Sequence, residues 1–200
     1  MKKTRQIDKK NCSLQTQGII AEENDYLKLW SLYKPQLEQL KKLEKKINYT
    51  FTDKYKLYEA LTHRSAISWF KQHVQQSTQI KDYKLCWNEK FEFLGDNILS
   101  FILTQYLWKN YSNLDEGQLS KARAQLVKAE TLTSVAKSIS LNKALIAGPE
   151  LLISQEIKNE SLLEDCLEAL IAALYLDGGL KQCTKVVIKL WNEFLKNIEE

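Results

Sequence analysis

The chain has 200 residues, of which 44% are hydrophobic and 27% charged, as in an ordinary globular protein. Six glycines and two prolines are too few for a turn-rich β-sandwich or barrel, so long helices are expected. The first ten residues alone carry the net charge of +4, so residues 11–200 sum to zero. This balance excludes a folded domain that binds nucleic acid through a strongly basic net charge.

In chain order, residues 1–20 are polar and patternless, which predicts a mobile tail. Residues 21–34 allow a short helix, and Pro35 marks the point where the next helix begins. The chain is therefore expected to divide into a partly disordered N-terminal extension, 1–35, and a single domain over 36–200.

Helical spacing covers most of this domain. Thr52 and Asp53 form an N-cap region before a helix in LYEALTHRS, whereas 66–87 is expected to be a loop or an irregular helix. Gly178 and Gly179 are expected to end a helix. Because no stretch alternates like a strand, the predicted fold class is all-α. The remaining helical patterns cover 88–108, 118–128, 130–139, 161–177 and 180–198.

The sequence contains no run of about 18 apolar residues, so no transmembrane helix is expected. The basic N-terminus is not followed by an apolar stretch, which argues against a secretory signal. The four cysteines lack CxxC spacing, which disfavours zinc and favours a reducing, intracellular compartment. Cys166 lies in an apolar run and is interpreted as a small buried residue.

Acidic residues on apolar helices are the most informative feature. In NEKFEFLGDNILSFIL, Glu89, Glu92 and Asp96 fall within about 60° of one another at 100° per residue. In SLLEDCLEALIAALYLD, Asp165 and Glu168 share one side of a helix that is apolar nearly all round. Carboxylates are almost never fully buried without a partner, so both groups need one.

A hard divalent cation resolves this requirement, because Mg²⁺ takes oxygen ligands. One such acidic group alone would indicate a solvated face, whereas two on two apolar helices favour a metal. A di-iron bundle is the rival, but it normally needs Glu-x-x-His on two helices, and neither His63 nor His73 has that spacing. Magnesium-assisted phosphoryl chemistry therefore fits better.

The same residues carry a resemblance to a known family. NEKFEFLGDNIL (88–99) is similar to the signature of ribonuclease III, NERLEFLGD, and differs from it at Lys90 and Phe91. The resemblance spans roughly residues 36–200. The further blocks that match in the family's order are ALTHRSA (60–66), DEGQLSKARAQLV (115–127) and LLEDCLEALIAALYLD (162–177).

The resemblance implies a helical homodimer that hydrolyses double-stranded RNA with Mg²⁺, for which Mn²⁺ can substitute. The expected products carry 5′-phosphate and 3′-hydroxyl ends. It further implies processing or decay of rRNA or mRNA precursors in the cytoplasm, an organelle matrix or the stroma, with no membrane and no small-molecule cofactor. The alternative is a non-catalytic RNA- or ribosome-associated structural protein with the same fold.

By motif position, the resemblance assigns the catalytic and metal-ligating roles to the four carboxylates Glu92, Asp96, Asp165 and Glu168. Helical spacing selects the same four. Glu89 and Glu116 match accessory acidic positions of the family's active centre. The alternatives for Glu89 are a dimer contact or a supporting residue behind the metal ligands, and the alternative for Glu116 is a helix-capping acid.

Basic residues give a weaker signal. Candidates for phosphate contacts are Lys121, Arg123 and Lys128, although a solvated helix surface explains them equally well. His63 and Arg64 are interpreted as structural residues at a helix junction.

The sequence also departs from the family's pattern. The segment 67–87 is longer than usual and interleaves aromatics with lysines, and the loop PELLISQEIKNES has Lys158 as its only basic residue. The double-stranded-RNA-binding domain that usually follows in the family is not among these 200 residues.

Overall fold

The computed structural model describes residues 34–73, 87–153 and 160–198. Within these ranges the chain folds into helices and has no strand beyond one isolated parallel bridge, so the all-α prediction is confirmed. Most of the predicted extension, with its short helix, lies outside the described residues. The elements are α2 (Lys34–Ile47), α3 (Lys54–Ala60), α4 (Arg64–His73), α5 (Glu89–Asn110), α6 (Glu116–Leu126), α7 (Ala129–Ser138), the 3₁₀ turn η3 (Leu141–Lys143), α8 (Pro149–Ile153), α9 (Glu160–Leu190) and α10 (Asn192–Lys196).

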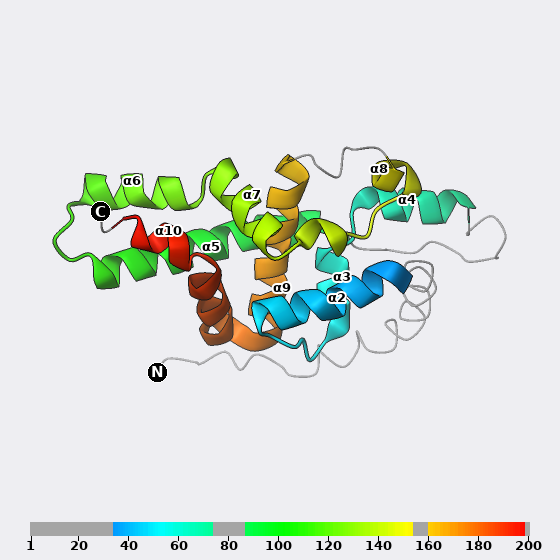
Figure 1. Cartoon of the computed structure of the whole chain (residues 1–200), viewed down its shortest axis with the longest axis horizontal. Coiled ribbons are helices and arrows are strands. Elements are labelled where there is room, and N and C mark those ends of the chain that lie inside the picture. Colours follow the sequence, from blue (N-terminus) through cyan, green and yellow to red (C-terminus); the bar gives the residue numbers. More distant parts are fainter. Residues whose placement is uncertain (1–33, 74–86, 154–159, 199–200) are drawn as a thin grey trace, which may run out of the picture.

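The two longest helices, α5 and α9, cross at the centre of the molecule, and shorter helices pack around them (Figure 1). Between Cys166 and Leu174 of α9, every residue except Glu168 is buried. Burial of each Leu or Ile side chain contributes about 1.5–3 kcal/mol, so this segment anchors the core. The interpretation of Cys166 as a small buried residue is confirmed.

A glycine sets the distance between the two crossing helices. A Cβ atom added to Gly95 of α5 would lie 1.8 Å from the backbone oxygen of Glu168 on α9, where no side chain fits. The two backbones therefore touch at this point. This contact brings the neighbours of Gly95 on α5 alongside the first half of α9.

The predicted glycine stop is confirmed: at Gly179, with φ 73° and ψ 174°, the backbone leaves the helical conformation and α9 turns in a new direction (Figure 1). Just before the turn, the buried carboxylate of Asp177 accepts hydrogen bonds from the Tyr49 hydroxyl at 2.7 Å and from the backbone N–H groups of Thr52 and Asp53 at 2.8 and 2.9 Å. Asp177 thereby ties α9 to the loop between α2 and α3.

The prediction of one helix through LYEALTHRS, followed by a loop or irregular helix, was wrong as far as residue 73; residues 74–86 of the predicted 66–87 segment lie outside the described residues. Helix α3 ends at Ala60, and α4 is a regular helix from Arg64 to His73. The chain leaves the helix to pair with a distant segment: Ile146 N–H donates to the Leu61 carbonyl at 2.9 Å, and His63 N–H donates to the Ile146 carbonyl at 2.8 Å. This pairing fixes the start of α4.

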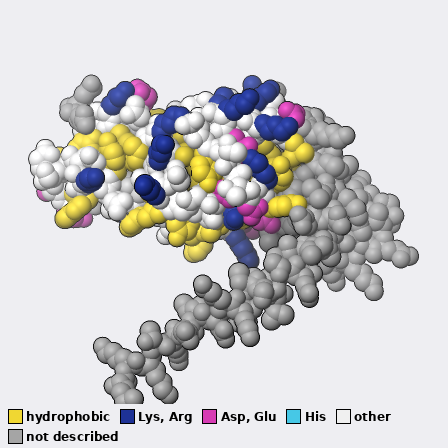
Figure 2. Space-filling model, turned by 90° about the horizontal axis from the view of Figure 1, so that it is seen from below, with side chains coloured by type: hydrophobic (Ala, Val, Ile, Leu, Met, Phe, Trp, Pro, Cys, Tyr) yellow, Lys and Arg dark blue, Asp and Glu magenta, His cyan; other side chains and the backbone are white. Residues whose placement is uncertain are grey.

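None of the helices in the described ranges is long and apolar enough to cross a bilayer. Figure 2 shows one face of the molecule, on which hydrophobic side chains reach the surface in several places between Lys and Arg side chains. On α5 the exposed large hydrophobic residues are Phe93, Phe101 and Trp108, with 77%, 51% and 76% of their surface accessible.

Candidate active site

Four carboxylates gather where α5 crosses α9. Glu92 and Asp96 flank Gly95 on α5, and the Gly95 backbone touches Glu168, which follows Asp165 by three residues on α9. Burial, and then the charges of Asp96, Glu92 and Asp165, raise the pKa of Glu168 to about 8. The structure therefore brings together the four carboxylates that the sequence selects.

Burial and like charges also raise the pKa of two other members of this group. Burial, and then the charges of Asp165 and Glu89, raise the pKa of Glu92. Burial, and then the charge of Glu164, raise the pKa of Asp165. In the described part of the chain no Lys or Arg forms an ion pair with any of the four. The four carboxylates therefore have no basic partner within the described part of the chain.

The donor set suits a hard divalent cation, because every donor is a carboxylate oxygen. Among the residues that the structure describes, no three His, Cys, Asp or Glu side chains converge into a ready-made metal cage. Mg²⁺ keeps several waters and binds through one or two carboxylates, so it does not need a closed cage. A bound cation would also relieve the repulsion within the group.

Glu89 lies beside this group, at the start of α5. Its carboxylate is 3.8 Å from the guanidinium of Arg64, the first residue of α4, and the two side chains are 53% and 71% exposed. An ion pair this long and this exposed contributes little to stability. Glu89 is therefore placed between the four carboxylates and α4. Local sequence spacing carries no signal for this pairing, since the two residues are distant along the chain.

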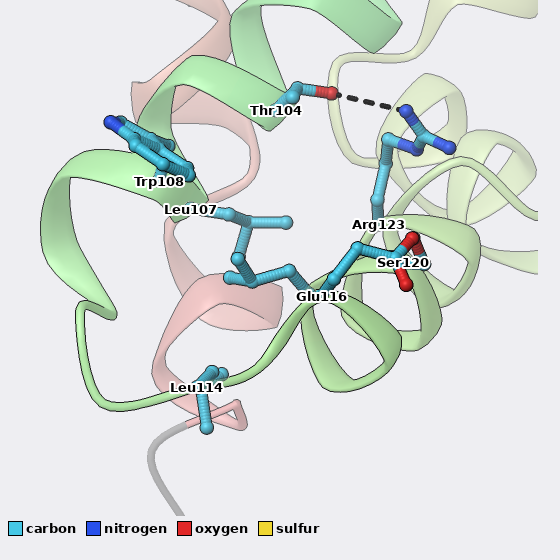
Figure 3. A pocket seen from close by; sticks show the side chains of 8 residues that line it. Thr104, Leu107, Trp108, Leu114, Glu116, Ser120 and Arg123 are labelled. Atoms are coloured by element: carbon cyan, nitrogen blue, oxygen red, sulfur yellow. Dashed lines mark hydrogen bonds between the residues drawn. The ribbon is translucent and has the colours of Figure 1, made fainter.

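Within one chain, Glu116 is not brought to the four carboxylates. It opens α6 and lines a cavity of about 270 Å³ together with Thr104 and Trp108 of α5 (Figure 3). Thr104 lies eight residues beyond Asp96, which is about 12 Å along the helix axis. The alternative role as capping acid is wrong, because Asp115 caps α6 and accepts from a backbone N–H at 2.8 Å.

The basic residues of α6 differ in their surroundings. Arg123 lines the same cavity as Glu116, and its guanidinium donates a long hydrogen bond of 3.5 Å to the Thr104 hydroxyl (Figure 3). Lys121 and Lys128 are exposed and form no ion pair with another described residue. The role of these three residues as phosphate contacts stays a prediction.

A family profile described as Ribonuclease-III-like matches residues 53–194. The protein named Ribonuclease 3 from Caldanaerobacter subterraneus subsp. tengcongensis is 42% identical over 156 residues, and that from Histophilus somni is 40% identical over 161 residues. These alignments cover 78% and 80% of this chain. The chain spans only 64% and 65% of the length of these two relatives.

Solved structures show the same similarity. The nuclease domain of ribonuclease III from Campylobacter jejuni matches with a TM-score of 0.64 at 31% identity, covering 76% of this chain and 95% of that domain. Dicer from Pichia stipitis matches with a TM-score of 0.52 at 23% identity, covering 74% of this chain and 58% of that one, which indicates a shared fold.

Proposed function

The chain belongs to the ribonuclease III family, and on this premise we propose that it is a Mg²⁺-dependent endoribonuclease that cleaves double-stranded RNA. The observation that carries the proposal is that Glu92, Asp96 and Asp165 lie near enough to Glu168 for their charges to raise its pKa, while none of the four has a basic partner in the described ranges. Phosphodiester hydrolysis would leave 5′-phosphate and 3′-hydroxyl ends. Precursors of rRNA or mRNA are the expected substrates.

The four carboxylates would hold Mg²⁺, or Mn²⁺ in its place. A bound ion supplies charge stabilisation at the phosphate and lowers the pKa of water. The protein's own part is to keep the carboxylates close together on two touching helices. Because burial and neighbouring charges raise the pKa of Glu168 to about 8, this residue holds a proton in the neutral range and must release it to act as a ligand. Metal affinity is therefore expected to rise with pH up to about 8.

The proposal includes a homodimer formed through α5. Phe93, Phe101 and Trp108 fall within about 80° of one another at 100° per residue, so the exposed apolar side chains form one stripe. A two-fold contact covers the same patch on both copies, and large exposed apolar patches mark interaction sites. The Campylobacter jejuni structure concerns a region involved in dimer formation of that nuclease domain, which supports the same arrangement here.

The test uses the purified chain and a long RNA duplex, with and without Mg²⁺. The parent chain should yield short duplex products only with Mg²⁺. Glu168→Gln should still bind the duplex but lose cleavage by about a hundredfold or more, because it removes one ligand and its charge. Glu160→Gln is the matched control, since Glu160 lies on the same helix but pairs with Lys137 at 3.0 Å. Undiminished cleavage by Glu168→Gln would overturn the assignment.

The same assay addresses the alternative of a non-catalytic RNA- or ribosome-associated structural protein. That function predicts duplex binding without cleavage at any Mg²⁺ concentration. The presence of all four carboxylates, with pKa values of Glu92, Asp165 and Glu168 raised by burial and like charge, favours the enzyme.

A further inference from the structure

We propose that the cavity between α4 and α8 binds a backbone phosphate of the RNA strand that the carboxylates cleave, with Arg64 and His63 as the contacting residues. This inference rests on the proposed function and adds a substrate contact to it. The cavity has a volume of about 580 Å³ and is lined by His63, Arg64, Ser65, Trp69, Gly148 and Glu150, among others. Neither α6 nor the four carboxylates contribute to it.

The hydrogen bonds of His63 fix which of its ring nitrogens carries the proton. Its Nδ1 atom accepts a hydrogen bond from the Ser65 backbone N–H at 3.2 Å, so this nitrogen carries no proton. The Ser65 hydroxyl lies 2.8 Å from the same nitrogen and itself accepts from the Gly148 N–H at 2.9 Å, so its own proton points to His63. The proton of the neutral ring is therefore assigned to Nε2, and this N–H group has no acceptor among the described residues.

The charge state of His63 supports this donor. Burial, and then the neighbouring Arg64 charge, lower the pKa of His63, so the ring stays neutral at pH 7. A neutral imidazole with Nδ1 occupied donates from Nε2 alone. His63 can therefore donate one hydrogen bond to an anionic oxygen without a change of protonation.

The backbone around His63 is held by close contacts. A Cβ atom added to Gly148 would lie 2.9 Å from the Ser65 backbone oxygen, so the two segments touch. The backbone of His63 is also hydrogen-bonded to Ile146 at 2.8 Å. These contacts hold His63 and the start of α4 in place before any ligand binds. A contact that is already ordered loses little entropy when a phosphate arrives.

Arg64 lies at the start of α4, next to Glu89 of α5. The Arg64 side chain is 71% exposed, and its guanidinium lies 3.8 Å from the Glu89 carboxylate. An ion pair at this distance and exposure restrains Arg64 only weakly. Glu89 precedes Glu92 by one helical turn, about 5 Å along α5. A strand that places one phosphate on the carboxylates can therefore present a neighbouring phosphate to Arg64. Guanidinium groups bind phosphate oxygens with strong, charge-assisted hydrogen bonds.

One acid opposes this arrangement. Glu150 of α8 lines the same cavity, and its side chain is exposed. Its charge repels a phosphate from the α8 side and restricts the anion to the α4 side, where Arg64 and His63 lie. Removal of this charge should therefore strengthen binding, an effect that a purely structural role for the cavity does not produce.

The experiment measures KM and kcat for duplex cleavage in Mg²⁺, using the full chain and a series of duplexes. Each duplex carries one neutral methylphosphonate linkage at a different position near the scissile bond. For the parent chain, one position should raise KM about tenfold. Arg64→Ala should raise KM about tenfold for the unmodified duplex, leave kcat within about twofold, and abolish the effect of that one linkage. Glu150→Gln should lower KM.

Lys71→Ala is the matched control, because Lys71 is exposed on the same helix and lies outside the cavity. It should leave both KM and the linkage effect unchanged. Glu89→Gln separates a phosphate contact from a role in positioning Glu89. If Arg64 binds phosphate, Arg64→Ala still raises KM in the Glu89→Gln background. His63→Gln, which keeps a donor, should lose less affinity than His63→Ala.

The outcomes separate the two proposals. If the parent chain cleaves the duplex but Arg64→Ala keeps its KM and its sensitivity to every linkage, the inference is wrong and the proposed function stands. The inference is also wrong, and the proposed function stands, if Arg64→Ala no longer raises KM in the Glu89→Gln background. If the parent chain does not cleave duplex RNA in Mg²⁺, the proposed function fails and the inference falls with it.

Discussion

Replacement of Glu168 by Gln should stabilise the metal-free protein at high pH. Burial, and then the charges of Asp96, Glu92 and Asp165, raise the pKa of Glu168 from its ordinary 4.5 to about 8 in the folded chain. The folded state therefore favours the protonated form. The stability that this group contributes is complete below about pH 4.5 and is lost as the pH rises through about 8. Gln stays neutral throughout and avoids that loss.

The size of the effect follows from the shift. A change of the pKa from 4.5 to about 8 corresponds to roughly 5 kcal/mol if nothing screens the charge. Because Glu168 is only half-buried, water and counterions reduce this repulsion, and we expect about 1–2 kcal/mol. For a chain of this length that is a rise in Tm of about 3–6 °C near pH 8, which disappears towards pH 4.

The assay is thermal unfolding in a chelator at several pH values, followed by the same series with Mg²⁺. Mg²⁺ should raise the Tm of the parent chain at pH 8 more than that of Glu168→Gln, because the variant has lost a ligand. Glu160→Gln is again the control and should gain no stability, since it breaks an ion pair with Lys137. An identical pH dependence for the parent chain and Glu168→Gln would refute the reasoning.

Three further changes test other parts of the structure. Gly95→Ala should cost about 3 kcal/mol or more in urea unfolding, because its Cβ would meet the backbone of Glu168 at 1.8 Å, whereas Gly117→Ala, whose nearest neighbour is 3.4 Å away, should cost far less. Asp177→Asn should cost about 2–4 kcal/mol in the same assay, because it weakens three hydrogen bonds to one carboxylate, two of them part-buried; an unchanged midpoint would contradict this role. Phe93→Asp should give a monomer in sedimentation analysis, whereas a dimer of unchanged affinity would exclude the exposed stripe of α5 as the interface.

Local spacing was sufficient to select the four carboxylates. Glu92 and Asp96 are four residues apart, and Asp165 and Glu168 are three apart, so each pair shares one side of its helix whatever the tertiary structure. The apolar surroundings then indicate burial. What spacing cannot give is the distance between the two pairs. The sequence shows a glycine at position 95, but only the fold reveals that its missing Cβ lets the α9 backbone touch α5.

Contacts between distant parts of the chain explain where the prediction failed. Helix α3 ends early because the residues after it pair with Ile146, and no local pattern records that partner. The ion pair of Arg64 with Glu89 likewise joins two helices that are separated in sequence. The interpretation of Arg64 as a packing residue missed its exposure, since exposure depends on how α4 sits beside α5. Such features depend on tertiary structure, which local periodicity does not encode.

The contrast between two acids on α9 supports the proposed cation site. Asp177 and Glu168 both interrupt an apolar helix, and their sequence contexts look alike. Burial alone would raise the pKa of Asp177, but hydrogen bonds from the loop between α2 and α3 and the charge of Lys56 lower it. Glu168 has no such donors among the described residues, and like charges raise its pKa to about 8. The fold thus supplies Asp177 with donors of its own and leaves Glu168, half-buried among like charges, without one in the described ranges, which supports the proposed cation site.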